Sequence, residues 1–262
     1  MKTSVIVTTY NRPDALKRTI ESLEDQTRPP YEVFIADDGS GPQTGELVKR
    51  FLSQSRFMLY HVWQEDQGFR AGWIRNKAIK KATGEYIILL DGDCVPTRHF
   101  IEDHVALATP GFFVQGKRVL INKRLAPCFS HKDARSIKRL VRYFLSGDIS
   151  NAHHLIRLPG FPASVSTRLS GIKSCNMGFY KKDIVSVNGF NQDFVGWGRE
   201  DSELAVRFFK YGLKRKEHRF MAICFHLWHK EYNRAHLGRN DQLLNRAIAS
   251  NEYFCSNGLV QK

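Results

Sequence analysis

Short apolar runs alternate with segments of helical period over the first hundred residues, and this alternation constrains the fold most. Four runs read as strands: Ser4–Thr9, Tyr31–Ala36, Phe57–Val62 and Glu85–Leu90. Segments of helical period separate them at about 13–23, 43–52 and 71–82. Because parallel strands need a crossover, the pattern predicts an α/β protein with a largely parallel, doubly wound sheet. The almost wholly apolar run Glu85–Leu90 is expected at the centre of that sheet.

Polar residues directly follow three of the predicted strands: Tyr10-Asn11, Asp37-Asp38 and Asp91-Gly92-Asp93. Ligands of open α/β sheets bind at the carboxyl ends of the strands, so we expect these groups to line one crevice. Asp91 and Asp93 offer oxygens to a divalent cation, which would stabilise a departing diphosphate. Asp-Gly is also a common turn signal, but its place after a buried strand favours the cation site. Asn11 is the expected cap of the first helix.

The second half of the chain is less regular. Phe112–Ile121 reads as a strand, Ala134–Leu145 as an amphipathic basic helix, and 158–171 as a loop. A helix is expected to begin at Glu200-Asp201, with Leu204, Ala205, Phe208 and Tyr211 on its apolar face. Met221–Phe225 is the last predicted strand, and it leads to His226 and His229. Each histidine is either a core or capping residue or a metal ligand that, with carboxylates, would suit manganese.

Several classes of site are excluded by missing motifs. The chain has no Gly-x-x-x-x-Gly-Lys-[Ser/Thr] and no Gly-x-Gly-x-x-Gly after its first strand, so P-loop kinases and classical dehydrogenases are excluded. Glu200-Asp201 is the best candidate for a general base that takes a proton from an attacking hydroxyl. A structural alternative is that these acids only favour a helix N-terminus. Trp197, between Gly196 and Gly198, suits close approach of a sugar face, or else belongs to the core.

The formal net charge of +14 implies an anionic partner, and nucleic acid, anionic lipid and phosphorylated substrates all qualify. Cations are concentrated between His131 and Arg168, where only Asp133 and Asp148 are acidic. Five cysteines without Cys-x-x-Cys spacing argue against a disulfide framework and a structural zinc site. No secretory signal or membrane span is recognisable, so we expect a cytoplasmic location.

Four segments together resemble known glycosyltransferase motifs. Ser4–Pro13 (SVIVTTYNRP), Glu32–Ser40 (EVFIADDGS) and Gly84–Asp93 (GEYIILLDGD) are similar to motifs of family 2 glycosyltransferases of GT-A fold. Gly189–Asp201 (GFNQDFVGWGRED) resembles the C-terminal motif of β-1,4-galactosyltransferases and bacterial chondroitin polymerases. The resemblance covers about 3–105 and 172–230. It implies one Rossmann-like domain over 1–262, with a mostly parallel, mixed central sheet flanked by helices.

The resemblance also implies a division of labour along the chain. Residues 1–105 would bind the nucleotide sugar, and 106–230 would bind the acceptor and carry out catalysis. A basic insertion at about 130–168 and a helical tail at 231–262 complete the expected organisation. The residues implied for the nucleotide sugar are Thr9, Tyr10, Asn11, Arg12, Asp38, Arg75, Asp91, Gly92 and Asp93.

Individual roles follow from the same resemblance. Tyr10 and Asp38 would contact the nucleoside, usually uridine, and Asp91 the ribose. Asp93 would bind the metal with His226, or with His229 as the fallback, and Mn²⁺ is preferred over Mg²⁺. Asp201 would be the base of an inverting reaction. Glu200 and Trp197, with Gly196 and Gly198, would hold acceptor or donor sugar.

We therefore expect transfer of a hexose or N-acetylhexosamine from a UDP-sugar to a hydroxyl of a glycan or lipid-linked glycan, in surface polysaccharide or lipopolysaccharide synthesis. The basic insertion matches none of the motifs. Its cations alternate with Ile137, Leu140, Val141, Phe144 and Leu145, so it is expected to dock on anionic membrane, at the cytoplasmic face of the inner membrane.

Two other functions stay open. A nucleic-acid-binding protein would account for the charge but leaves Asp-Gly-Asp and Gly-Trp-Gly without a role, so no nucleic acid partner is expected. A sugar nucleotidyltransferase resembles Gly-x-Gly-x-Arg near its first strand, where this chain has Thr-Thr-Tyr-Asn-Arg.

Overall fold

A mixed eight-stranded sheet forms the centre of the molecule in the computed structural model, which describes residues 1–230 and 233–261. Its strands, in spatial order, are β3 (Met58–Trp63), β2 (Glu32–Asp37), β1 (Thr3–Thr9), β4 (Tyr86–Asp91), β10 (Asn176–Tyr180), β6 (Phe112–Gln115), β11 (Lys214–Glu217) and β9 (Ser164–Ser166). The first four are parallel, and β10 runs antiparallel to both β4 and β6. The predicted α/β class and central β4 are confirmed.

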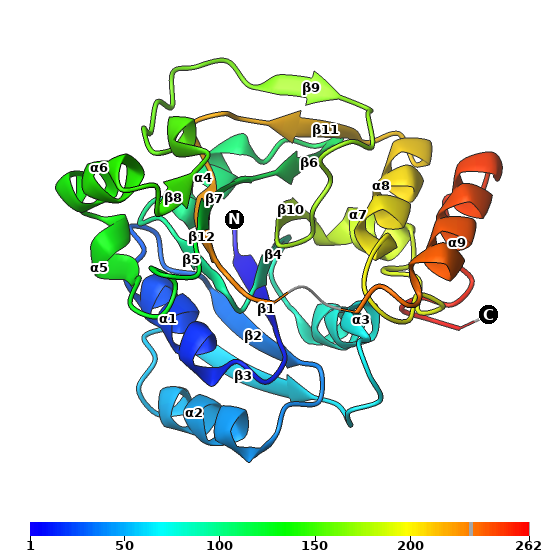
Figure 1. Cartoon of the computed structure of the whole chain (residues 1–262). Coiled ribbons are helices and arrows are strands. Elements are labelled where there is room, and N and C mark those ends of the chain that lie inside the picture. Colours follow the sequence, from blue (N-terminus) through cyan, green and yellow to red (C-terminus); the bar gives the residue numbers. More distant parts are fainter. Residues whose placement is uncertain (231–232, 262) are drawn as a thin grey trace.

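Helices cover both faces of this sheet (Figure 1). One face carries α1 (Pro13–Glu24), α2 (Pro42–Leu52) and α4 (Phe100–Leu107), and the other carries α3 (Ala71–Lys81), α7 (Lys181–Ser186) and α8 (Glu200–Lys210). The alternation of side chains along a strand explains the two layers, since Val5 and Val7 pack toward α1 whereas Ile6 packs toward α3. In the part of the chain that the structure describes, no helix is both long and apolar enough to cross a bilayer.

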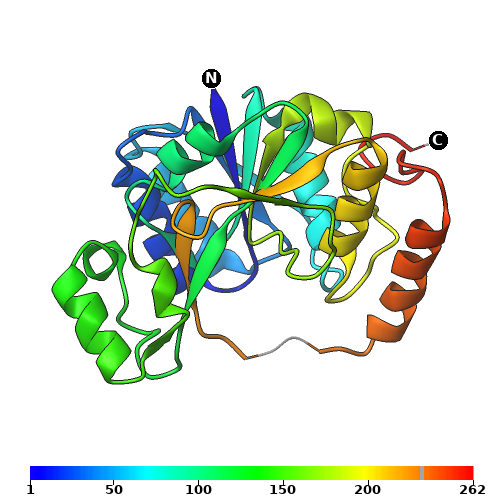
Figure 2. The ribbon, with the colours of Figure 1, turned by 90° about the horizontal axis from the view of Figure 1, so that it is seen from above.

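A second, smaller sheet lies beside the first. Its strands, in spatial order, are β5 (Cys94–Pro96), β12 (Ile223–Leu227), β7 (Lys117–Ile121) and β8 (Ile149–Ser150). Leu140 of the basic insertion packs against this sheet, and Ile149 of the insertion lies in its strand β8. Figure 2 shows the helices of the insertion projecting from one corner of the molecule. The C-terminal helix α9 (Leu237–Ala249) packs against α8, within the predicted helical tail, of which residues 231, 232 and 262 lie outside the described residues.

The predicted single helix Ala134–Leu145 is wrong: the segment forms α5 (His131–Ala134) and α6 (Ile137–Leu145). Two serines explain the break, because Ser130 forms a capping box at the start of α5 and the side chain of Ser136 caps α6. The predicted loop at 158–171 is also partly wrong, since it contains β9, after the short 3-10 helix η1 (Ala152–His154).

Other predicted boundaries need correction. Asn11 does not cap α1: its φ is 48°, and its Oδ1 accepts a hydrogen bond from the Gly41 N–H. Tyr211 follows the end of α8 and is exposed rather than part of the apolar face. The last strand continues through His226 to Leu227. All five cysteines are free, and Cys94 and Cys224 are buried in the core between the large sheet and its helices.

The predicted strand Phe112–Ile121 is broken at Gly116, where the chain leaves the large sheet for the small one. A Cβ at this position would lie 2.1 Å from Oδ1 of Asn176. That buried amide cannot move easily, because its nitrogen donates to the carbonyls of Lys117 and Ala222 and its oxygen contacts His104 Nε2. Gly116 is therefore required where the two sheets meet.

We predict that Gly116→Ala lowers the free energy of unfolding by about 1–3 kcal/mol, the usual cost of forcing an extra group into a packed site. Urea unfolding followed by circular dichroism measures it. Gly45→Ala is the matched control, because a Cβ there meets nothing within 4 Å and alanine favours the helix α2. Equal stability of the two variants would contradict the account of this junction.

Candidate active site

The carboxyl ends of β1 and β4 and the start of α8 surround a cavity of about 470 Å³. Most predicted site residues line it: Thr9, Tyr10, Arg12, Asp38, Arg75, Asp91, Gly92, Asp93, Trp197, Glu200, Asp201, His226 and His229. These residues come from both halves of the sequence. Its size falls in the range of small-molecule sites.

A buried arginine connects the two halves of this cavity. Arg75, on α3, donates from Nε to Thr8 Oγ1 at 3.0 Å, from Nη2 to Asp91 Oδ1 at 3.2 Å, and from Nη1 to Glu200 Oε1 at 3.4 Å. Its side chain is 4% exposed. Asp91 and Glu200 thus supply the negative charge that a buried guanidinium needs.

Two adjacent carboxyl groups at the start of α8 have shifted acidities. Burial raises the pKa of Glu200 to about 7, the neighbouring Asp201 adds to the rise, and Arg75 opposes it. Glu200 Oε2 is buried and has no hydrogen-bond partner among the described residues. Burial also raises the pKa of Asp201, against the opposing charge of Arg75. Both groups are therefore poised nearer to neutral pH than exposed carboxyls are.

The carboxylate of Asp201 is held by backbone groups on two sides. Its Oδ1 accepts from the Ser202 N–H at 2.7 Å, and its Oδ2 accepts from the Ser174 N–H at 3.3 Å. Ser174 precedes β10, so the large sheet helps to orient this side chain. Asp201 also lines the cavity, which leaves it accessible to a ligand hydroxyl.

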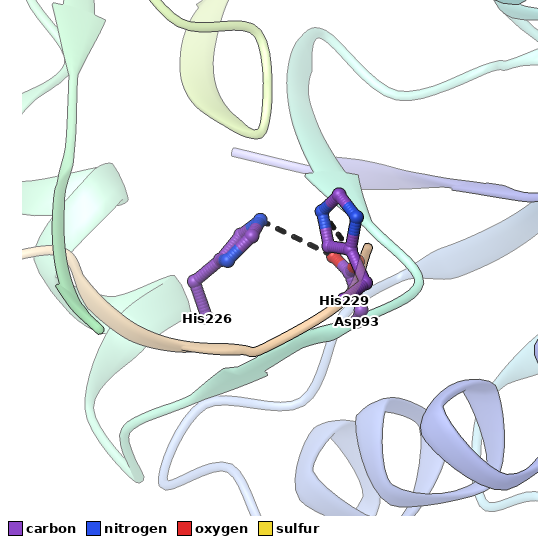
Figure 3. A group of neighbouring side chains, drawn as sticks. All are labelled: Asp93, His226 and His229. Atoms are coloured by element: carbon purple, nitrogen blue, oxygen red, sulfur yellow. Dashed lines mark ion pairs between the residues drawn. The ribbon is translucent and has the colours of Figure 1, made fainter. Parts of the chain in front are cut away.

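Asp93, His226 and His229 form a cluster with metal-binding geometry (Figure 3). Nε2 of His226 lies 3.7 Å from Asp93 Oδ1, and Nε2 of His229 lies 3.6 Å from Asp93 Oδ2. The three ligand atoms lie within 4.8 Å of one another. Nitrogen and oxygen ligands at such separations fit one divalent ion bonded at about 2.0–2.2 Å.

The charge state of His226 and the hydrogen bonding of His229 both suit a metal ligand. Burial lowers the pKa of His226 to about 4, and the charge of Arg118 adds to the effect, so the ring is neutral at pH 7. His229 Nδ1 lies 2.8 Å from the Lys230 carbonyl oxygen. Because that oxygen only accepts, Nδ1 carries the hydrogen, and Nε2 presents its lone pair toward Asp93 in the neutral ring. Asp93 Oδ2 also accepts from Arg12 Nη1 at 2.6 Å.

The opposite end of the cavity is built by the loops after β1, β2 and β3. Tyr10 donates its hydroxyl hydrogen to Asp66 Oδ2 at 2.8 Å. Asp38 accepts from Gln64 Nε2 at 2.5 Å and from the Arg70 N–H at 2.7 Å. Burial raises the pKa of Asp38 to about 6. An aromatic face and a carboxylate are thus held next to each other in this part of the cavity.

Some residues that the sequence singled out do not line the cavity. Asn11 braces the loop after β1 against Gly41, and Asp37 is fully buried, accepting from the Ser40 N–H and lying 3.0 Å from His61 Nε2. Gly196 and Gly198 have φ values of 75° and 105° and pack against α9 and the residue before it. The two glycines are therefore explained by the positive φ values of the backbone at these positions. Of the three residues, Trp197 alone lines the cavity and could contact a sugar face.

Several lining residues carried no sequence signal: Phe69, Arg118, Lys173, Ser174, Cys175, Trp228 and Arg234. They belong to no motif, and only the folding of distant segments brings them to the cavity. Arg234 lies 5.4 Å from the ring centre of Trp197, and Lys123 lies 5.2 Å from that of Trp228. Both indoles are partly exposed, which suits contact with the apolar face of a sugar.

The sequence matches two known families in consecutive segments. The chain belongs to glycosyl transferase family 2, whose sequence profile matches residues 4–161. A profile described as the N-terminal domain of galactosyltransferase matches residues 161–230. The expected family and the galactosyltransferase-like C-terminal segment are therefore confirmed.

Curated relatives include polysaccharide synthases. A hyaluronan synthase of Pasteurella multocida is 29% identical over 80% of this chain and 23% of its own length. A validoxylamine A glucosyltransferase of Streptomyces hygroscopicus subsp. limoneus is 30% identical over 80% of this chain and 48% of its own. A chondroitin synthase of Escherichia coli is 26% identical over 80% of this chain and 32% of its own. The chain thus spans less than half of each of these relatives.

Solved structures confirm the GT-A fold. The match to S. aureus TarS 1-349 in complex with UDP covers 96% of this chain and 65% of the TarS chain, with a TM-score of 0.67 and 18% identity. The match to the mannosyltransferase PcManGT from Pyrobaculum calidifontis, in complex with GDP-Man and Mn²⁺, covers 95% of this chain and 63% of the PcManGT chain, with a TM-score of 0.62 and 20% identity.

We predict that Glu200→Gln raises the melting temperature at pH 8. Glutamate ordinarily titrates near 4.5, so between pH 4.5 and about 7 the folded state keeps a proton that the unfolded state has lost. The stability of the wild type therefore falls as the pH rises through this window, and glutamine removes that loss. The shift should be roughly 2–4 °C for each kcal/mol recovered, and it should shrink toward pH 5.

Scanning calorimetry at both pH values measures the effect. Glu46→Gln, at an exposed position of α2, is the control and should follow the wild type at both. A Glu200→Gln protein that melts below the wild type at pH 8 would show that the charge of Glu200 is fully compensated by Arg75.

Proposed function

We propose that this chain is a metal-dependent, inverting glycosyltransferase that moves a hexose or N-acetylhexosamine from a UDP-sugar to a glycan hydroxyl. One observation carries the proposal: the backbone-held Asp201 carboxylate lines the same cavity as the Asp93, His226 and His229 cluster. A base and a diphosphate site are the two parts that this reaction needs. Family membership favours sugar transfer over nucleic acid binding and nucleotidyl transfer.

The donor is assigned to the part of the cavity formed by β1, β2 and β4. Tyr10 would stack on the base, Asp38 would accept a hydrogen bond from it, and Asp91 would contact the ribose. A divalent ion held by Asp93, His226 and His229, with Mn²⁺ preferred over Mg²⁺, would neutralise the charge that develops on the leaving diphosphate. The structures with similar folds were solved with UDP and with GDP-Man and Mn²⁺, which supports a nucleotide-sugar donor.

Asp201 carries out the proton transfer. The acceptor hydroxyl oxygen attacks the anomeric carbon on the face opposite the diphosphate, and the bond between that carbon and the diphosphate oxygen breaks. The hydroxyl proton passes to the Asp201 carboxylate, whose position the Ser174 and Ser202 amides maintain. A diphosphate leaves without protonation, so one base is sufficient. Because the hydroxyl attacks the face opposite the diphosphate in one step, the configuration at the anomeric carbon inverts. Glu200 and Trp197 would hold the sugars on either side of the reacting bond.

We further propose that α6 docks on an anionic membrane, which would place the site near a lipid-linked glycan for surface polysaccharide or lipopolysaccharide synthesis at the cytoplasmic face of the inner membrane. Its exposed apolar side chains are Ile137, Val141, Phe144 and Leu145, whereas Leu140 is buried against the small sheet. Lys138, Arg139 and Arg142 are exposed on the same helix. Apolar side chains flanked by cations suit the interface of an anionic bilayer.

We predict that Asp201→Asn lowers kcat by about 10²–10⁴-fold, the usual contribution of a general base. UDP affinity should be retained, because Asp201 is assigned to the acceptor. The measurement is UDP release from a panel of UDP-sugars with Mn²⁺, together with calorimetry of UDP binding. Asp14→Asn, at an exposed position of α1, should behave as the wild type. Full activity of Asp201→Asn would remove Asp201 from the mechanism.

Loss of any one metal ligand should weaken Mn²⁺ binding by more than about 10–100-fold, the effect typical of replacing a residue that hydrogen-bonds to a ligand. The variants are Asp93→Ala, His226→Ala and His229→Ala, with exposed His153→Ala as the control. Electron paramagnetic resonance of free Mn²⁺ in the presence of UDP measures the affinity without any catalytic readout. If either histidine variant binds as the wild type does, that histidine is not a ligand.

Sedimentation with vesicles tests the membrane proposal. The wild type should bind anionic vesicles better than neutral ones, and Phe144→Asp with Leu145→Asp should weaken that binding by on the order of 10-fold or more. Val185→Asp replaces another exposed apolar residue, on α7, and should have no effect. Equal binding to anionic and neutral vesicles would refute docking through α6.

A further inference from the structure

A second cavity, of about 200 Å³, adjoins the active-site cavity. The two share part of their lining, namely Arg118, Leu120, Lys173 and Cys175. The second cavity lies between the small sheet and the segment that leads into β10, and none of Tyr10, Asp38 or Asp91 reaches it. It is therefore a continuation of the site away from the nucleoside end.

The second cavity is cationic. Lys117, Arg118 and Lys173 line it, and Glu217 is the one acid among the described residues that do so. Glu217 is already engaged, because Lys117 Nζ lies 2.8 Å from its Oε1 and Arg215 Nη2 lies 3.4 Å from its Oε2. The negative charge of Glu217 is thus neutralised by Lys117 and Arg215. It does not offset the charges of Arg118 and Lys173.

Arg118 and Lys173 form no ion pair with a carboxylate in the described part of the chain. The guanidinium of Arg118 makes a long contact, from Nη1 to Cys175 Sγ at 3.9 Å. The side chain of Gln115 holds the Lys173 backbone on both sides, and Lys173 is an exposed residue. Two cations without carboxylate partners, on the wall shared by two cavities, are suited to bind an anion.

The position of Lys173 relates this charge to the acceptor. Lys173 directly precedes Ser174, whose N–H donates to the Asp201 carboxylate, and its charge opposes the rise in the pKa of Asp201. A sugar with a hydroxyl directed at Asp201 would therefore have its neighbouring groups close to Lys173, on the wall that Arg118 also lines.

We propose that the acceptor is an acidic glycan, with an anionic group on or next to the reacting sugar bound by Arg118 and Lys173. A hexuronate carboxylate or a phosphate ester fits equally, since both accept paired hydrogen bonds from a guanidinium and form an ion pair with an ammonium group. This inference rests on the proposed function, because it places the acceptor beside Asp201. It adds a substrate class that transfer to a glycan hydroxyl does not by itself specify.

Three matched acceptors test the proposal. They share one glycan and differ only in the terminal residue, which is glucose, glucuronate or glucose 6-phosphate. Calorimetry measures their binding to the protein loaded with UDP and Mn²⁺, and kcat/KM is measured for those that are extended. An acidic acceptor should bind on the order of 10–100-fold more tightly than the neutral one, as charge-assisted hydrogen bonds do. The two acidic arms show whether carboxylate or phosphate is preferred.

The double variant Arg118→Gln with Lys173→Gln should abolish this preference, and Lys80→Gln, at an exposed position of α3, should leave it unchanged. Equal binding of the acidic and neutral glycans to the wild type, including no binding of either, would overturn the inference. So would a preference that survives in the double variant. Weaker UDP binding by the double variant would assign the two cations to the donor and also overturn it.

The proposed function fails separately. If the wild type binds no UDP in the presence of Mn²⁺, or releases none from any UDP-sugar, the glycosyltransferase assignment itself is wrong. If UDP binding and release are intact while acidic and neutral glycans bind alike, only the acidic-acceptor inference is lost.

Discussion

The buried guanidinium of Arg75 is the contact on which the rest of the site depends. It joins Thr8 at the end of β1, Asp91 at the end of β4 and Glu200 at the start of α8. A guanidinium with 4% exposure needs such partners, and Asp91 supplies a negative charge directly opposite it. Because Glu200 adjoins Asp201, this contact fixes the candidate base relative to the strand ends.

The arrangement separates two chemical tasks within one cavity. Asp93, His226 and His229 bring one carboxylate and two imidazole groups together where β4 ends beside the small sheet (Figure 3). The start of α8 instead carries two carboxyl groups whose pKa values are raised by burial. The first set suits a cation and the second suits proton transfer. The first set takes Asp93 from the segment that one family profile matches and both histidines from the segment that the other matches, so the two consecutive segments form a single site.

Much of this could be predicted from sequence, because the strand-helix alternation and the residues at strand ends are local patterns. Asp91, Asp93 and the pair Glu200-Asp201 could be singled out by their places after a buried strand or at a helix start. The choice of Asp201 within that pair came from the resemblance to the galactosyltransferase motif. The break at Gly116 could not be predicted, since its cause is Asn176, sixty residues later in the chain. Arg118 and Lys173 were missed for the same reason: on the chain they are ordinary surface cations, and the pairing of β7 with β12 and the path into β10 make them part of the site.

The most direct test of single displacement through Asp201 is the anomeric configuration of the sugar released from a UDP-sugar when water replaces the acceptor. Proton nuclear magnetic resonance in the first minutes of the reaction reads this configuration before mutarotation. An α-linked donor should give the β-sugar, because water activated by Asp201 attacks the face opposite the diphosphate. Release of the α-sugar would exclude attack on the face opposite the diphosphate and would contradict the assignment of Asp201 as the base of a single displacement.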